Sequence, residues 1–157
     1  MKIKLLLFLS CVFVLNVAMR CDDDYDEDRE RMNILRIEAF NLNNEGQDPV
    51  LSDDPIKKEA YVIGIERITD AQKEEYYYIP NDTVESEKIY TLNNLNAQYP
   101  AGSDVTSLFV KMPYGSWSKY MYALRKEIEP GVHSFKIVLS CTNGNVFETS
   151  TTPINLY

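Results

Sequence analysis

The 157-residue chain has few of the residues on which most enzyme and metal sites depend. It contains one histidine, His133, one tryptophan, Trp117, and three cysteines. A single histidine excludes a metal centre built on several imidazoles, and a Ser/His/Asp arrangement would have to use this one residue. No phosphate loop, dinucleotide fingerprint or G-x-S-x-G motif occurs. We therefore expect no cofactor, no metal and no catalytic residue.

Basic residues are also scarce. Lysine and arginine number 16 against 24 acidic residues, which gives a net charge of −8. Removing the first twenty residues takes away Lys2, Lys4 and Arg20, so the remaining chain has a net charge of −11. A chain this acidic has no electrostatic footprint for nucleic acid, and we expect no nucleic-acid partner.

The first twenty residues predict a secretory address. Lys2 and Lys4 precede the apolar run 5–18, which is shorter than the roughly 20 residues of a membrane-spanning helix. A short positive region followed by such a run is typical of a signal peptide that is removed from the mature protein. We interpret 1–20 as that signal peptide.

A cysteine directly after a signal peptide, here Cys21, is typical of a lipoprotein. Acylation of its sulfur and its amine would hold the protein on a membrane by two or three chains, whereas one chain gives only marginal binding. Arg20 departs from the bacterial lipobox, which has a small residue before the cysteine. Ordinary secretion with cleavage near Ala18, or an uncleaved signal anchor, is the alternative. We expect lipidation at Cys21, which would anchor the protein to a membrane of the cell envelope.

The segment 21–31 continues from this cysteine as an acidic run. Positions 22–31 hold seven acids against Arg29 and Arg31 and have no aliphatic side chain. Such a stretch cannot bury enough apolar area to offset the entropy of ordering, so we expect a disordered, solvated tether. The run fails as an EF-hand, because the required glycine and glutamate are missing from their positions. A cysteine followed by acids also resembles the surface-export signal of Bacteroidetes lipoproteins.

Apolar side chains after the tether recur with a period close to two, as in half-buried strands. The stretches that alternate most clearly are 33–41, 61–66, 108–112, 120–124 and 133–141. Shorter candidates are 76–79 and an edge strand at 88–92. Asn143-Gly144 is a strong hairpin signal. We predict that 32–157 is one all-β domain, an antiparallel immunoglobulin-like β-sandwich of about seven or eight strands.

Three phrases in this region carry a family resemblance. They are EAYVIGIERI at 59–68, NLNAQYPAGSDVTSLFVKMP at 94–113 and EPGVHSFKIVLSCTNGNVFETSTTPINL at 129–156. They resemble segments of a family of small Bacteroidetes lipoproteins with no assigned function, over nearly all of the mature domain. The resemblance implies an outer-membrane or periplasmic lipoprotein with a β-sandwich and no family active site.

Aromatic residues support a binding function. Tyr114 and Trp117 follow Pro113 in an expected loop, and exposed rings of this kind stack on sugars. We expect a non-catalytic interaction module of unknown ligand, whose partner is a glycan or an envelope protein and in which Trp117 fills the core. The alternative is a carbohydrate-binding accessory protein that uses Tyr114 and Trp117 for a glycan. A hydrolase is the third hypothesis, and its acid pairs would be Asp53-Asp54, Glu74-Glu75 or Glu127 with Glu129.

Three other residues have specific expectations. Asp82-Thr83-Val84 resembles a short acceptor for O-glycosylation in Bacteroidetes, which makes Thr83 a candidate glycosylation site. The alternative is an ordinary turn after Pro80. His133 and Cys141 are in phase with the apolar face of one strand, which predicts a packed histidine and an inert buried thiol.

The first prediction concerns anchoring at Cys21. We expect mass spectrometry of the mature N-terminus to find Cys21 acylated, because the apolar run, the position of the cysteine and the acidic segment agree. Cys21→Ser should abolish acylation and release the protein from the membrane fraction. A mature chain that starts at Met19, or an unmodified Cys21, would contradict this prediction.

Overall fold

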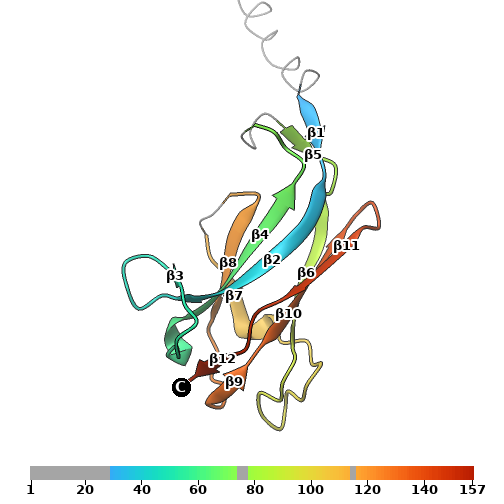
Figure 1. Ribbon diagram of the computed structural model, residues 1–157. Coiled ribbons are helices and arrows are strands. Elements are labelled where there is room, and N and C mark those ends of the chain that lie inside the picture. The colour runs from blue at the N-terminus through green and yellow to red at the C-terminus, as the bar shows by residue number, and fades with distance from the viewer. Residues whose placement is uncertain (1–28, 74–77, 114–115) are drawn as a thin grey trace, which may run out of the picture. The chain divides into compact units, whose positions relative to one another are not determined.

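The computed structural model describes residues 29–73, 78–113 and 116–157. Arg31–Tyr157 form one compact unit of strands (Figure 1). The predicted signal peptide 1–20, Cys21 and most of the acidic tether lie outside the described residues. The first described strand, β1 (Glu30–Met32), begins two residues before the expected start of the domain. In the described part of the chain, no helix is long and apolar enough to cross a membrane.

The larger sheet has five strands. In order they are β3 (Val50–Leu51), β2 (Ile34–Asn43), β4 (Tyr61–Thr69), β8 (Lys119–Leu124) and β7 (Phe109–Lys111). All four pairings are antiparallel. Successive side chains of a strand point to opposite faces, so Ile63, Ile65 and Arg67 of β4 share one face. β4 is the central strand of this sheet, and Ile63 and Ile65 on its inward face lie in the apolar core.

The smaller sheet has three antiparallel strands. In order they are β11 (Val146–Ser150), β10 (Phe135–Cys141) and β6 (Val84–Thr91). The turn at Asn143-Gly144 joins β10 to β11, and Gly144 has a φ of 87°, a conformation that favours glycine. The predicted hairpin is therefore confirmed. The edge strand expected at 88–92 is also confirmed, but it is longer and begins at Val84.

Two short ribbons and two 3₁₀ turns complete the described residues. The ribbons are β1 with β5 (Tyr78–Pro80) and β9 (Gly131–His133) with β12 (Ile154–Leu156), and the turns are η1 (Lys58–Ala60) and η3 (Thr106–Leu108). These residues contain no α-helix, so the all-β prediction is confirmed. The twelve described strands outnumber the seven or eight expected, and six of the twelve have only two or three residues.

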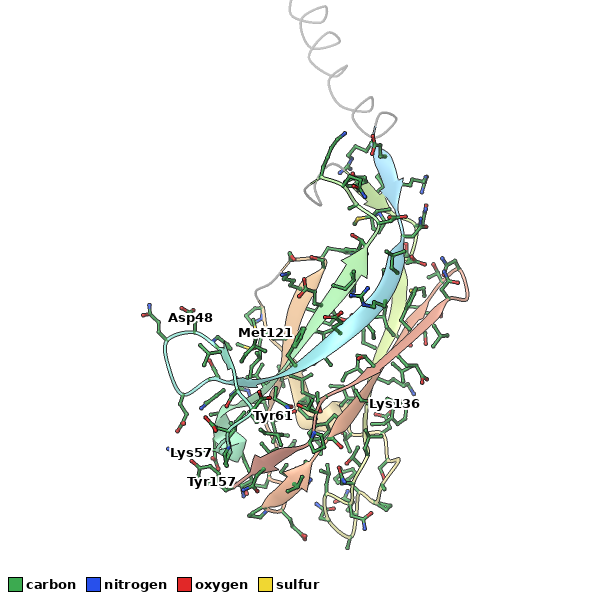
Figure 2. The ribbon with its side chains drawn as sticks, viewed as in Figure 1. Asp48, Lys57, Tyr61, Met121, Lys136 and Tyr157 are labelled. Carbon is green, nitrogen blue, oxygen red and sulfur yellow. The ribbon has the colours of Figure 1, made fainter. Side chains whose placement is uncertain are left out.

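The inward faces of the two larger sheets share one apolar core. Ile65 of the larger sheet and Ile137 and Leu139 of the smaller sheet are at most 2% exposed. The rings of Tyr61 and Phe135 meet between the sheets with centroids 5.7 Å apart, and Tyr61 lies in the interior in Figure 2. Burying one such side chain contributes roughly 1.5–3 kcal/mol, so these contacts supply much of what holds the sheets together.

The prediction of a single strand over 133–141 is wrong in one respect, because the strand is interrupted at Ser134. β9 ends at His133 and pairs with β12, whereas β10 begins at Phe135 in the smaller sheet. The Ser134 N–H and hydroxyl both donate to Asn93 Oδ1, at 3.0 and 2.8 Å, which takes this residue out of the ladder. His133 is nevertheless buried, with Nε2 2.8 Å from the Glu129 carbonyl oxygen, as expected for a packed histidine.

The second prediction concerns Ile137, which is fully buried at the centre of β10. Ile137→Ala should lower the free energy of unfolding by about 2–5 kcal/mol, since it removes buried surface and leaves a cavity. Val138, the next residue, faces the other side of the sheet and is only half-buried. Val138→Ala should therefore lower the free energy of unfolding by less. Urea titrations of the two variants measure both losses. A larger loss at Val138 would mean that the face assigned to this strand is wrong.

Candidate functional site

A groove of about 520 Å³ lies beside β6, where this strand and β7, edge strands of the two larger sheets, come together. One wall is the chain over 83–87. The opposite wall includes Lys111 of β7 and Tyr122 of β8. Arg67 of β4 and Trp117, just before β8, also line the groove. Four separate segments of the chain therefore meet at this site.

Glu87 is the carboxylate at the centre of the groove. In the register of β6 with β10, Glu87 lies opposite Leu139 and Ile89 lies opposite Ile137. Because Ile89, Ile137 and Leu139 all face the core, the same alternation directs Glu87 inward between the sheets. Its side chain is only 11% exposed. A charge in such a position requires charged or hydrogen-bonding partners.

Arg67 is the main partner of Glu87 and joins the two sheets. Its NH2 group lies 2.8 Å from Glu87 Oε1, and its NH1 group donates to the Trp117 carbonyl oxygen at 2.7 Å. The guanidinium lies 4.8 Å from the ring centroid of Trp117 and 4.5 Å from that of Tyr120. The side chain is 5% exposed. Arg67 is thus fixed by an ion pair, a carbonyl group and two aromatic rings.

Lys111 and Tyr122 bind the second oxygen of Glu87. Lys111 Nζ lies 2.9 Å from Oε2, and the Tyr122 hydroxyl donates to the same oxygen. Lys111 Nζ also lies 4.3 Å from the Tyr120 ring centroid. Half of the Lys111 side chain is exposed, unlike the buried Arg67. The carboxylate therefore has a buried cation on one side and a half-exposed cation on the other.

The pKa shifts in this cluster follow from burial and from these partners. Burial by itself would raise the pKa of Glu87, but the hydrogen bonds from Tyr122 and Lys111 and the charges of Lys111 and Arg67 lower it below its ordinary value. Burial, followed by the bond to Glu87 and its charge, raises the pKa of Tyr122. Both shifts move away from neutrality, so Glu87 is ionised and Tyr122 is protonated at pH 7. This pair is poorly suited to exchange protons with a substrate.

Two of the residues singled out in the sequence, Trp117 and Thr83, line this groove. Trp117 is half-buried and packs against the core, so its position combines the two expected roles. Thr83 is exposed at the start of the β6 wall. Tyr114 lies outside the described residues, as does Cys21. The sequence thus identified two residues of the groove but neither Arg67 nor Glu87.

Asp82, next to Thr83, has a structural role. It is 1% exposed and accepts hydrogen bonds from the Ile34 N–H at 2.7 Å and from the side chains of Asn143 and Asn145 at 2.9 and 2.8 Å. Burial acts to raise its pKa, but these three bonds lower it overall. In the folded domain, the Asp82 side chain of the resembled glycosylation acceptor is therefore covered, while Thr83 is exposed.

The other candidate catalytic and metal-binding residues do not form a site in the described part of the chain. Asp53, Asp54, Glu127 and Glu129 are exposed, and Glu74 and Glu75 lie outside the described residues. Cys141 is buried, and that burial raises the pKa of its thiol, as expected for an inert core residue. No cluster of three or more metal-ligating side chains occurs in the described part of the chain.

The third prediction concerns the Arg67–Glu87 pair. Glu87→Leu leaves the Arg67 charge buried without an anionic partner and should lower the free energy of unfolding by about 3 kcal/mol or more, whereas Arg67→Met should cost less, because Lys111 and Tyr122 still bind Glu87. The double variant should lose clearly less than the sum of the two single variants, because it leaves neither charge unpaired. Urea titrations of the four proteins measure this coupling. Additive losses would show that the pair does not act as a unit.

A fall in pH provides a second readout for the same variants. The pKa of Glu87 in the folded protein lies below its ordinary value of 4.5. The stability that Glu87 contributes is therefore complete above that ordinary value and is lost as the pH falls through the lower, folded value. Between about pH 7 and about pH 3, the unmodified protein should lose more stability than Glu87→Leu. Equal losses would contradict the assigned shift.

No model of a known protein family matches the chain, and no curated protein or solved structure matches it either. The features from which a function can be inferred are therefore those of the groove. They are a fixed set of charges, a half-buried tryptophan ring and one edge of a sheet.

Proposed function

We propose that this protein is a non-catalytic lipoprotein of the bacterial cell envelope whose domain binds a ligand in the groove beside β6. In this proposal the mature chain begins at Cys21 with its lipid, an acidic tether follows, and the strands form an immunoglobulin-like β-sandwich of the type found in small Bacteroidetes lipoproteins. The composition, the N-terminal pattern and the all-β structure support it.

The observation that carries the binding function is the preformed arrangement of the groove. Arg67 and Glu87 are buried and are held by several partners each, so they do not have to be ordered when a ligand arrives. Such preorganisation lowers the entropic cost of binding. A groove with an aromatic ring and a few convergent polar groups is typical of small-molecule sites.

A carbohydrate is the ligand class that Trp117 favours. Aromatic rings stack on the C–H faces of sugars, and sugar hydroxyl groups accept hydrogen bonds from charged donors such as the Lys111 ammonium group. Lys111 lines the same groove as Trp117. In this role the protein would be a carbohydrate-binding accessory protein, with Thr83 at the rim of the site.

The lack of a suitable acid and base in the groove supports a binding role over hydrolysis. Hydrolysis of a glycoside uses two carboxyl groups on opposite sides of the bond, one of them with a raised pKa. In the groove, the pKa of Glu87 is lowered, and both of its oxygens are already bound by other side chains. Glu85 also lines the groove, and it is exposed. This environment stabilises charge and does not hold a proton for a leaving group.

The fourth prediction uses Trp117, the single tryptophan of the chain, as a reporter. Titration with soluble oligosaccharides should change its fluorescence and reduce its quenching by acrylamide, because a sugar on the ring excludes the quencher. Trp117→Ala should abolish heat release in calorimetry with the same sugar. Lys136→Ala, on the outer face of the smaller sheet, is the control and should bind normally.

Two outcomes would count against this function. If a sugar binds and the quenching of Trp117 does not change, the ligand occupies another site. If no oligosaccharide of a broad panel binds, a carbohydrate is not the ligand of this domain.

A further inference from the structure

We propose that the ligand of the groove is a saccharide with an anionic group, a carboxylate or a sulfate, and that Lys111 binds this group. The proposal rests on the saccharide-binding function above and adds the chemical class of the sugar. It follows from the hydrogen-bonding groups and charges that the groove leaves available. Three of its residues determine which ligand charge is favoured: Glu87, Lys111 and Arg67.

Glu87 has little capacity left to accept hydrogen bonds from a ligand. Its Oε1 receives Arg67, and its Oε2 receives both Lys111 and Tyr122. A carboxylate oxygen accepts about two hydrogen bonds, so Oε2 is saturated. The hydroxyl proton of Tyr122 is used in the same contact. The acidic centre of the groove is therefore occupied by the protein itself.

Lys111 has the opposite property. An ammonium group carries three N–H donors, and the described residues take one of them, through Glu87 Oε2. The side chain is 50% exposed and lines the groove. Its remaining donors are therefore open to a ligand, and they carry positive charge. An anionic acceptor satisfies such donors better than a neutral hydroxyl group, since charge-assisted hydrogen bonds are roughly twice as strong.

Arg67 adds a second positive charge at the same place, but its guanidinium is buried and already binds Trp117 and Glu87, so it acts through its charge and does not contact the ligand. Arg67 and Lys111 together bring two positive charges to one carboxylate, so the cluster as a whole is positive. This local excess occurs in a chain whose net charge is −8. At physiological ionic strength, charges more than about 8 Å away are largely screened, so the nearby cations decide which ligand is favoured.

Glu85 is the acidic residue of the groove that would repel an anionic ligand most directly. It lines the groove on the β6 wall, and its side chain is exposed. An exposed carboxylate interacts through water and is screened, whereas Lys111 contacts the ligand directly. Glu85 also provides a test, because its removal should strengthen binding of an anion and leave a neutral sugar unaffected.

The experiment compares matched probes on the mature, full-length domain. The probes are trigalacturonic acid, the corresponding neutral trisaccharide of galactose, and a sulfated form of that neutral sugar. Calorimetry should show tighter binding of at least one anionic probe than of the neutral one. Lys111→Met should weaken binding of the anionic probe by about tenfold or more, as expected for a lost hydrogen bond to a charged group. Lys111→Arg should restore most of this affinity, and Glu85→Gln should increase it.

A matched control separates ligand contact from damage to the fold. Lys136 also pairs with a glutamate, Glu148, and lies 5.6 Å from the ring centroid of Tyr90, but it is on the outer face of the smaller sheet (Figure 2). Lys136→Met should leave the affinities for all three probes unchanged. Thermal unfolding of each variant shows whether the fold is retained, and Lys111→Arg keeps the charge beside Glu87 in any case.

The outcomes distinguish this inference from the function on which it rests. Equal affinity for the neutral and anionic probes, or an equal effect of Lys111→Met on both, overturns the anionic class and leaves saccharide binding in place. Binding of the carboxylated probe alone, or of the sulfated probe alone, identifies the group. If none of the probes binds and a broad panel of sugars also fails, saccharide binding itself is wrong.

Discussion

One buried ion pair, between Arg67 and Glu87, joins the two larger sheets at the groove. Taking both charges out of water costs several kcal/mol per ion, and their attraction offsets this only when the other polar atoms are also satisfied. Lys111, Tyr122 and the carbonyl of Trp117 meet most of this requirement, and the buried Nε of Arg67 has no hydrogen-bond partner among the described residues. The pair therefore adds a directional contact between β4 of one sheet and β6 of the other.

The domain is consequently held together in two different ways. Around Ile137 and Phe135 the sheets are joined by close apolar packing, which is not directional. Beside β6 they are joined by directional contacts to charged groups, and Asp82 ties Ile34 to the hairpin of β10 and β11 by similar means. The groove lies beside these charged contacts.

The sequence predicted the parts of this structure that depend on local pattern. Alternation identified β2, β4, β8 and β10, and Asn143-Gly144 identified the hairpin, because both signals lie within a few residues. The break at Ser134 depends on Asn93, which is distant in the chain. Glu87 was missed for a similar reason: in Glu-Ser-Glu-Lys it looks solvated, and only the pairing with β10 shows that it faces inward. Trp117 and Thr83 line the groove, and the binding and glycosylation roles expected for them stay predictions, as do the roles of Cys21 and Tyr114.

The pair also limits how this sequence can change over generations. A substitution of Glu87 alone leaves the Arg67 charge buried without an anionic partner, and that loss is a large part of the roughly 5–15 kcal/mol by which a domain is stable. Descendants can lose both charges or keep both, but seldom lose Glu87 alone. Positions 67 and 87 should therefore vary jointly across lineages. Two residues on neighbouring sheets can mark common ancestry after overall sequence identity has faded.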